Sequence, residues 1–384
     1  MAFSGLSDLK ELNICTHNPE WLPMVLEVES DAFMGLNNLQ YLNFTHNNLL
    51  TVPQSLFCGL TSLQALNMSV NYLQDVADLG FSSSDILSCK LPLEILDLSH
   101  NSLANIKERA FGQLANLKNL QLKSNNLSIL EGKAFSGLKS LQILNLANNK
   151  LVSLPKDIFS DASESLRELY LENNSLSVLK AELFNPMKEL LILNLSRNEI
   201  SNDWINSETF SSLTKLVALD LSYNKISKID ENLLNGLVSL QMLSLSHNLI
   251  SNVEANSFFY QANLRILILS SNLVETIDPK AFSHLQLLNS LLLGHNKLNT
   301  IHKNSLRNCT NLQDLGLNNN NLKTIPKAVK SLEILRTLDV AENDISSLKN
   351  GSFEGLKNLY GLRMSRNGLA EIEAGKMNHY FFFN

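Results

Sequence analysis

The stretch LKNLQLKSNNL, residues 117–127, sets the pattern of the chain, and LQILNLANNKL, residues 141–151, repeats it 24 residues later. Leucine stands at positions one, four, six and eleven of this template (lysine or another residue fills the gaps), and asparagine stands at position nine. The template can be placed fifteen times, and nine of the fourteen spacings between copies are 24 residues. The chain is therefore a repeat array from end to end.

The template L-x-x-L-x-L-x-x-N-x-L is the leucine-rich-repeat signature. Its L-x-L segment predicts a short strand with leucines facing inward and the intervening residues facing solvent. One repeat cannot bury its own apolar face, so neighbouring repeats must stack into a shared core. We expect an α/β solenoid of about 15 repeats: a curved horseshoe with a parallel concave sheet and an irregular or short helical convex side.

The ninth template position is asparagine in fourteen of the fifteen repeats. Its amide can bond backbone groups that would otherwise be buried without partners. Stacked repeats would align these side chains in a structural ladder, formed by Asn47, Asn71, Asn101, Asn125, Asn149, Asn174, Asn198, Asn224, Asn248, Asn272, Asn296, Asn320, Asn343 and Asn367.

A second apolar row lies six residues before the first leucine of each repeat, and phenylalanine dominates it. We expect this row to pack the convex side. Most of the 17 phenylalanines belong to it, with Leu87, Leu234, Leu306 and Val329 in other slots. The spacing also predicts one array over residues 1–384, uncapped at both ends as in a piece of a longer protein, and an irregular insertion over 74–92.

Composition and motifs narrow the functional classes. The net charge of −6 is unlike the basic footprint of a nucleic-acid binder, so no nucleic-acid partner is expected. The chain contains neither an apolar run long enough to span a membrane nor a recognisable signal peptide. The common catalytic and nucleotide-binding motifs are also missing. We therefore expect a non-enzymatic protein without catalytic residues, cofactor or metal.

Four histidines, at positions 46, 100, 247 and 295, each precede a ladder asparagine. They resemble a metal or pH-sensing site. A histidine cluster, however, needs adjacent repeats, and His46, His100, His247 and His295 lie mostly in distant ones. A solvent-facing position that tolerates polar residues is the favoured interpretation.

The cysteines allow two interpretations. Cys58 and Cys89 flank most of the insertion, where a disulfide would tether a long loop and stabilise it by about 3 kcal/mol. They could equally be two unpaired thiols in a cytosolic protein. We expect Cys15 and Cys309 to be free.

Glycosylation sequons occur about as often as chance predicts in a chain with 49 asparagines, so their number is no evidence of secretion. They lie at Asn43, Asn67, Asn126, Asn173, Asn194, Asn308 and Asn350. If the protein is secreted, Asn308 and Asn350 are the best candidates because their segments are convex, with Asn126 and Asn173 next.

The concave face is the default binding surface of a solenoid. Its outward positions are polar in the early repeats and apolar further along, which suggests a contact with a protein partner. Ordinary β-propensity of strand positions would give the same residues. The candidate patch consists of Tyr170, Ile192, Tyr223, Met242, Ile266, Ile268 and Leu292.

Residues outside the template carry a closer resemblance. The runs at 195–227, containing the segment NDWIN, and at 311–364 resemble the long-ectodomain insect Toll receptors of the Tollo and eighteen-wheeler group. LKELNICTHNPEW at 9–21 and LEVESDAFMGL at 26–36 are similar to the first repeats of that group. The FC…C arrangement of Cys58 and Cys89 also matches, so the resemblance implies a disulfide between them.

The resemblance implies a recognition ectodomain at the cell surface, without direct membrane contact by this segment. In that family a membrane span and a cytoplasmic TIR signalling domain follow such repeats, and neither is recognisable here. The implied partners are a cystine-knot type protein ligand, another receptor ectodomain, or both, in innate immune or developmental signalling. Two alternatives are an extracellular adhesion or matrix protein and an intracellular scaffold.

Overall fold

A computed structural model describes residue 3 and residues 5–16, 25–81, 91–180, 182–230 and 233–373. The chain divides into two compact units, Met1–Leu193 and Asn194–Asn384. Each unit is a stack of coils in which every coil contributes one three-residue strand, and each strand is centred on the fourth template position. The leucine-rich-repeat solenoid predicted from the sequence is confirmed.

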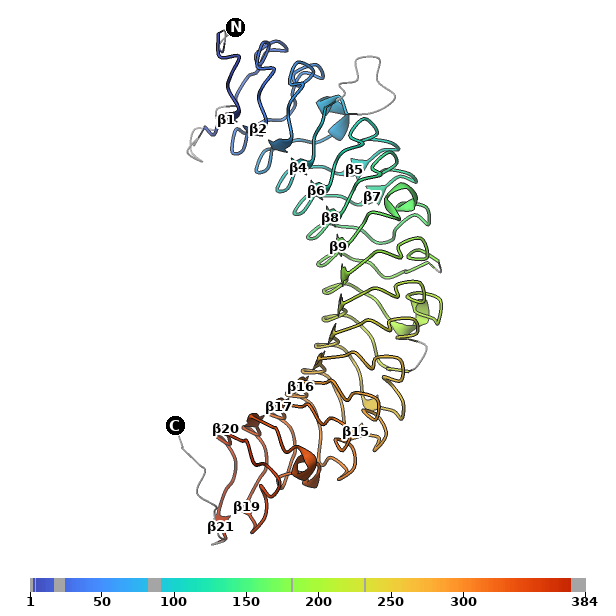
Figure 1. Ribbon diagram of the computed structural model, residues 1–384, viewed down its shortest axis with the longest axis vertical. Coiled ribbons are helices and arrows are strands. Elements are labelled where there is room, and N and C mark those ends of the chain that lie inside the picture. The colour runs from blue at the N-terminus through green and yellow to red at the C-terminus, as the bar shows by residue number, and fades with distance from the viewer. Residues whose placement is uncertain are drawn as a thin grey trace. The chain divides into compact units, whose positions relative to one another are not determined.

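In the first unit the strands pair in parallel and in chain order (Figure 1). Their central leucines point into the coil, as at Leu120, which is fully buried. The residues on both sides of each leucine form what we call the strand face. The strands are β1 (Glu11–Asn13), β2 (Tyr41–Asn43), β3 (Ala65–Asn67), β4 (Ile95–Asp97), β6 (Asn119–Gln121), β8 (Ile143–Asn145) and β9 (Glu168–Tyr170), with β10 (Ile192–Asn194) at the unit boundary.

The second unit repeats this arrangement. Parallel pairing in register joins each strand to the next, so that Leu219, Leu243 and Leu267 are consecutive partners. The strands are β11 (Ala218–Asp220), β12 (Met242–Ser244), β14 (Ile266–Ile268), β16 (Ser290–Leu292), β17 (Asp314–Gly316), β18 (Thr337–Asp339) and β20 (Gly361–Arg363).

The segments that return from each ladder asparagine to the next strand form the opposite side, here called the return side. It carries two-residue strands and 3-10 turns, and the described residues contain no α-helix. The paired strands are β5 (Asn105–Ile106) with β7 (Ile129–Leu130), β13 (Asn252–Val253) with β15 (Thr276–Ile277), and β19 (Ser347–Leu348) with β21 (Glu371–Ile372). The 3-10 helices are η1 (Val76–Leu79), η2 (Ser160–Ala162), η3 (Asn202–Trp204) and η4 (Lys327–Ser331).

Ladder asparagines bond two coils at once. Asn149 Nδ2 donates to the carbonyl oxygens of Leu122, in the preceding coil, and Leu146, in its own coil, both at 3.0 Å. Its Oδ1 accepts from the backbone N–H of Leu127 at 3.0 Å. Equivalent bonds recur along each unit, so the side chain satisfies backbone groups that have no strand partner.

Stacked phenylalanines fill the return side of the core. Phe111 and Phe135 lie with ring centroids 6.3 Å apart and nearly parallel, and Phe258 and Phe282 lie 5.8 Å apart. All four are buried. Aromatic pairs in this geometry add to the free energy gained by burying their area.

The first part of the predicted irregular insertion is ordered. Asp75 caps η1 by accepting from the Ala77 N–H at 2.9 Å, and it forms an ion pair with Lys107. Phe81, just after η1, is fully buried 6.0 Å from Phe57. The sequence pattern did not assign Phe81 to the core. Leu87, which it placed in that row, and Cys89 lie outside the described residues.

Candidate interaction surface

The second unit brings four of the predicted patch residues together on its strand face. Strand register places Met242 beside Ile266 and Ile268 beside Leu292. Since Ile266 and Ile268 share strand β14, the four side chains form one contiguous cluster, named here the apolar strand patch. Ile266 is 38% exposed, and the other three are half-buried.

Leu292 lies over a glycine. A Cβ on Gly316, its partner in β17, would be 3.2 Å from Leu292 Cδ2. Beyond the patch the outward positions become polar: Thr337 Oγ1 donates to Asp314 Oδ1 at 2.5 Å, and Arg363 lies 3.6 Å from Asp339. Polar and charged residues thus border the apolar strand patch on the side of β17 and β18.

Tyr170 and Ile192 belong to the first unit, and both are half-buried. The Tyr170 hydroxyl donates to Glu168 Oε2 at 2.8 Å. Burial, aided by Glu168, raises the pKa of Tyr170 to about 12. This phenol therefore stays neutral and is held by its own strand.

Tyr223 lies away from the strands, in a stack that the sequence analysis did not anticipate. Its ring lies between the Arg197 guanidinium, 4.1 Å from the ring centroid, and the His247 ring, 3.9 Å away and nearly parallel. Burial in this stack, with the positive Arg197 and then His295, lowers the pKa of His247. The stack lies exposed on the second unit.

Arg197, Tyr223 and His247 occupy the same position of the repeat, immediately before the ladder asparagine. The backbone there is left-handed in repeat after repeat, with φ of 54° at Arg197, 53° at Tyr223 and 52° at His247. His46, His100 and His295 occupy it too. Asn and His are enriched in left-handed conformations, so backbone geometry explains these histidines. The described residues contain no group of three or more potential metal ligands.

The predicted sequons occupy two environments. Asn43, Asn67 and Asn194 lie on strands, where each side chain accepts the N–H of the residue two positions later. Asn126, Asn173, Asn308 and Asn350 are exposed. Asn173 Nδ2 donates to Asn148 Oδ1 at 2.8 Å, and Asn308 Nδ2 donates to the carbonyl of Ser283 at 2.8 Å.

Cys15 and Cys309 are free, as expected from the sequence. Cys15 is exposed, whereas Cys309 is buried with its Sγ 3.9 Å from the Phe282 carbonyl. The predicted Cys58–Cys89 bridge stays a prediction, because Cys89 lies outside the described residues.

Burial raises the pKa of the Cys309 thiol from 9.0 to about 12. The thiolate is the reactive form, so the fraction available at pH 8 falls by roughly a thousandfold. We expect iodoacetamide to modify Cys15 in the folded protein and to spare Cys309 until denaturant is added. Mass spectrometry of the two peptides measures this, and equal labelling of both cysteines in the native state would contradict the buried placement.

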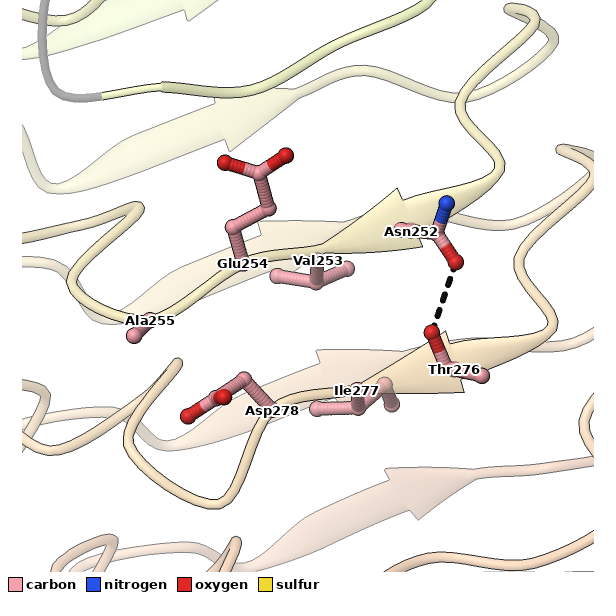
Figure 2. A pocket seen from close by; sticks show the side chains of 7 residues that line it. All are labelled: Asn252, Val253, Glu254, Ala255, Thr276, Ile277 and Asp278. Atoms are coloured by element: carbon pink, nitrogen blue, oxygen red, sulfur yellow. Dashed lines mark hydrogen bonds between the residues drawn. The ribbon is translucent and has the colours of Figure 1, made fainter.

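One concave feature of the described return side lies at two paired short strands of the second unit. Figure 2 shows a groove between β13 and β15 in which Thr276 donates to Asn252 Oδ1 at 2.6 Å and the Glu254 carboxylate points away from Asp278. Its lining residues are Asn252, Val253, Glu254, Ala255, Thr276, Ile277 and Asp278. Two carboxylates that point apart, one of them 3.8 Å from Lys228, do not form an acid–base pair.

A leucine-rich-repeat family model matches residues 25–73, 92–151, 164–226, 203–250, 262–322 and 310–369. The chain belongs to the leucine-rich-repeat family. This fold is typical of non-enzymatic binding domains, and no catalytic family is indicated. No helix in the described ranges has the length and apolarity needed to cross a membrane.

Toll-like receptor 7 of Drosophila melanogaster is 38% identical over 125 residues, which is 31% of this chain and 8% of the receptor. The structure of the glycosylated Drosophila Toll–Spätzle complex matches with a TM-score of 0.77 and 24% identity, over 96% of this chain and 52% of that chain. The structure of the TLR13–ssRNA13 complex matches with a TM-score of 0.54 and 24% identity, over 98% of this chain and 58% of that chain. The match thus spans 8% of Toll-like receptor 7 and about half of each of the two solved receptor chains, and the structural matches establish the fold.

Proposed function

We propose that the chain is part of the recognition ectodomain of a Toll-type receptor and that it binds a protein partner through the strand face of its second unit. The apolar strand patch carries the proposal, because four apolar side chains gather on a face that carries Asp220 on one neighbouring strand and Asp314 and Asp339 on the strands beyond the other side. The 38% identity to Toll-like receptor 7 supports the receptor class. Assignment to the Tollo and eighteen-wheeler group is the finer part of the same proposal.

A protein partner fits the surface better than a nucleic acid. RNA binding needs an array of lysine and arginine to neutralise phosphates. The outward strand positions next to the patch instead carry Asp220, Asp314 and Asp339, and the net charge is −6. Toll is bound to Spätzle in its complex, which supports a protein ligand. The cystine-knot type that the sequence resemblance implies is the proposed ligand class, with a second receptor ectodomain as a further partner.

This function places the chain outside the cell or at the cell surface. The proposed location favours the disulfide between Cys58 and Cys89 and glycans on the exposed sequons. Peptide mapping of secreted protein under non-reducing conditions tests the bridge. Two free thiols at these positions would count against the location and in favour of the intracellular scaffold.

The binding test uses the chain secreted from insect cells and Drosophila Spätzle as the probe, with a second copy of the chain as an alternative probe. We expect the double variant Ile268→Glu/Leu292→Glu to weaken binding at least about tenfold, because two carboxylates would be desolvated at the contact. Biolayer interferometry measures the change, and circular dichroism checks the fold.

The control is Val152→Glu, which adds one carboxylate, half the charge change of the double variant, at an aliphatic side chain that is 54% exposed and off the strand face. Unchanged binding in both variants would remove the apolar strand patch from the proposal. If the chain binds a second copy of itself but not Spätzle, and the double variant abolishes that binding, the result would favour an extracellular adhesion or matrix protein.

A further inference from the structure

An aromatic cluster lies exposed on the return side of the second unit. The Phe259 ring meets Tyr260 edge-on at 5.1 Å and His284 at 4.7 Å between centroids. Phe259 is 46% exposed and Tyr260 40% exposed, although Phe258 beside them is buried. Three rings gathered on the surface leave apolar area in water, which calls for an occupant.

The next coil supplies a sequon at the same position. Tyr260, His284 and Asn308 are spaced by 24 residues, and each comes two residues after the buried residue of the return row. They therefore stand on three consecutive coils. Asn308 Nδ2 donates to the Ser283 carbonyl at 2.8 Å, and the Ser283 hydroxyl lies 3.0 Å from His284 Nδ1. The amide nitrogen that would carry a sugar is thus fixed beside the aromatic cluster.

We propose that Asn308 carries an N-linked glycan whose first sugars stack on His284, Phe259 and Tyr260. This inference rests on the extracellular location proposed above. A glycosylated asparagine amide keeps one N–H, so the bond to Ser283 and a sugar on Nδ2 are compatible. Neighbouring coils are about 5 Å apart where their strands pair, and a pyranose ring is of similar size. Successive sugars therefore reach His284 and then Tyr260.

The occupant is the chain's own carbohydrate because the attachment point and the apolar surface coincide. The C–H faces of N-acetylglucosamine pack on aromatic rings as other apolar groups do. A glycan here also blocks protein contacts on this part of the return side, since it is bulky and hydrated. Partner binding is then left to the strand face of the same unit.

Asn350 provides a matched sequon in the same unit. It is exposed on the return side, and its backbone N–H donates to Glu373 Oε2 at 3.0 Å. A Cβ on the next residue, Gly351, would lie 3.6 Å from Glu354 Oε2 and 3.8 Å from Lys330 Nζ, so charged groups lie beside this sequon. Its glycan should extend freely into solvent.

The experiment compares the two glycans in protein secreted from insect cells. Glycopeptide mass spectrometry gives the occupancy at each site. Digestion of the folded protein with a peptide N-glycosidase gives the rate of release. We expect both sites to be occupied and release at Asn308 to be about fivefold slower than at Asn350, the effect of one aromatic contact. Phe259→Ala and, separately, Tyr260→Ser should raise the rate at Asn308 and leave Asn350 unchanged.

The outcomes separate this inference from the location on which it rests. An occupied Asn350 with an empty Asn308 overturns the stacked glycan and leaves the extracellular location intact. Equal release at both sites, unaffected by Phe259→Ala or Tyr260→Ser, overturns the stacking. Absence of glycan from every sequon of protein purified from its native source overturns the location and the inference together. Loss of Spätzle binding on Phe259→Ala would assign the cluster to a protein partner instead.

Discussion

Replacing Asn320 by alanine destabilises the second unit by about 3 kcal/mol and exposes a specific backbone amide to exchange. Asn320 is buried, and its Oδ1 accepts from the Leu298 N–H at 2.9 Å. Its Nδ2 donates to the carbonyls of Leu293 and Leu317 at 3.0 and 3.1 Å. Alanine removes these bonds together with a fourth, from Nδ2 to the Asn318 carbonyl at 3.3 Å.

The size of the effect follows from the groups left behind rather than from the bonds lost. A typical bond is worth about 1 kcal/mol net, whereas a buried donor without a partner costs about 1–3 kcal/mol. Leu298 has no accessible surface, so water does not replace the amide oxygen. Hydrogen exchange followed by mass spectrometry should show faster exchange in the peptide that contains Leu298.

Asn321→Ala is the matched control. Asn321 is the next residue and is exposed, and its backbone N–H donates to the Leu298 carbonyl at 2.9 Å, which alanine preserves. We expect a change within about 0.5 kcal/mol. If both variants unfold at the same denaturant concentration, the ladder contributes no more than a surface asparagine.

The periodic part of the structure was predictable because each template position has one physical role. Leucines at positions four and six, with asparagine at nine, predict a strand, its buried face and the bond that links two coils. A shift of the strand pairing by one residue would turn the Leu120 side chain toward solvent and the Asn119 side chain toward the core. The pattern therefore fixes the register as well as the element.

Contacts between stacked coils whose spacing in the sequence is irregular were not predictable in the same way. The sequence predicts Tyr223 as part of the concave patch, although it occupies the position before the ladder asparagine, as His247 does. The 26-residue spacing from Arg197 to Tyr223 hides their alignment, because the segment containing η3 shifts the phase. Phe81 was missed for a similar reason: the insertion offered both Phe81 and Leu87, and spacing alone favours Leu87.

Phe258→Ala gives the other large effect, a loss of about 3–5 kcal/mol of unfolding free energy. Phe258 is 1% exposed and stacks on Phe282 of the next coil. Phe259→Ala is the matched control: it removes the same side chain at the adjacent residue, which is 46% exposed, and should cost less than about 1 kcal/mol. Both variants are compared in an Asn308→Gln background, so that no glycan contributes at Phe259. Chemical denaturation followed by circular dichroism measures the difference.

The consequences of Phe258→Ala should also spread along the stack. In a repeat array each coil is stabilised mainly by its two neighbours, so a cavity at Phe258 weakens the coil that contains Phe282 as well as its own. We expect faster hydrogen exchange at Leu267 and Leu291, the central strand residues of these two coils, and little change at Leu338, three coils further on. Uniformly faster exchange at all three positions would mean that the unit unfolds as one block, and the nearest-neighbour account of its stability would be wrong.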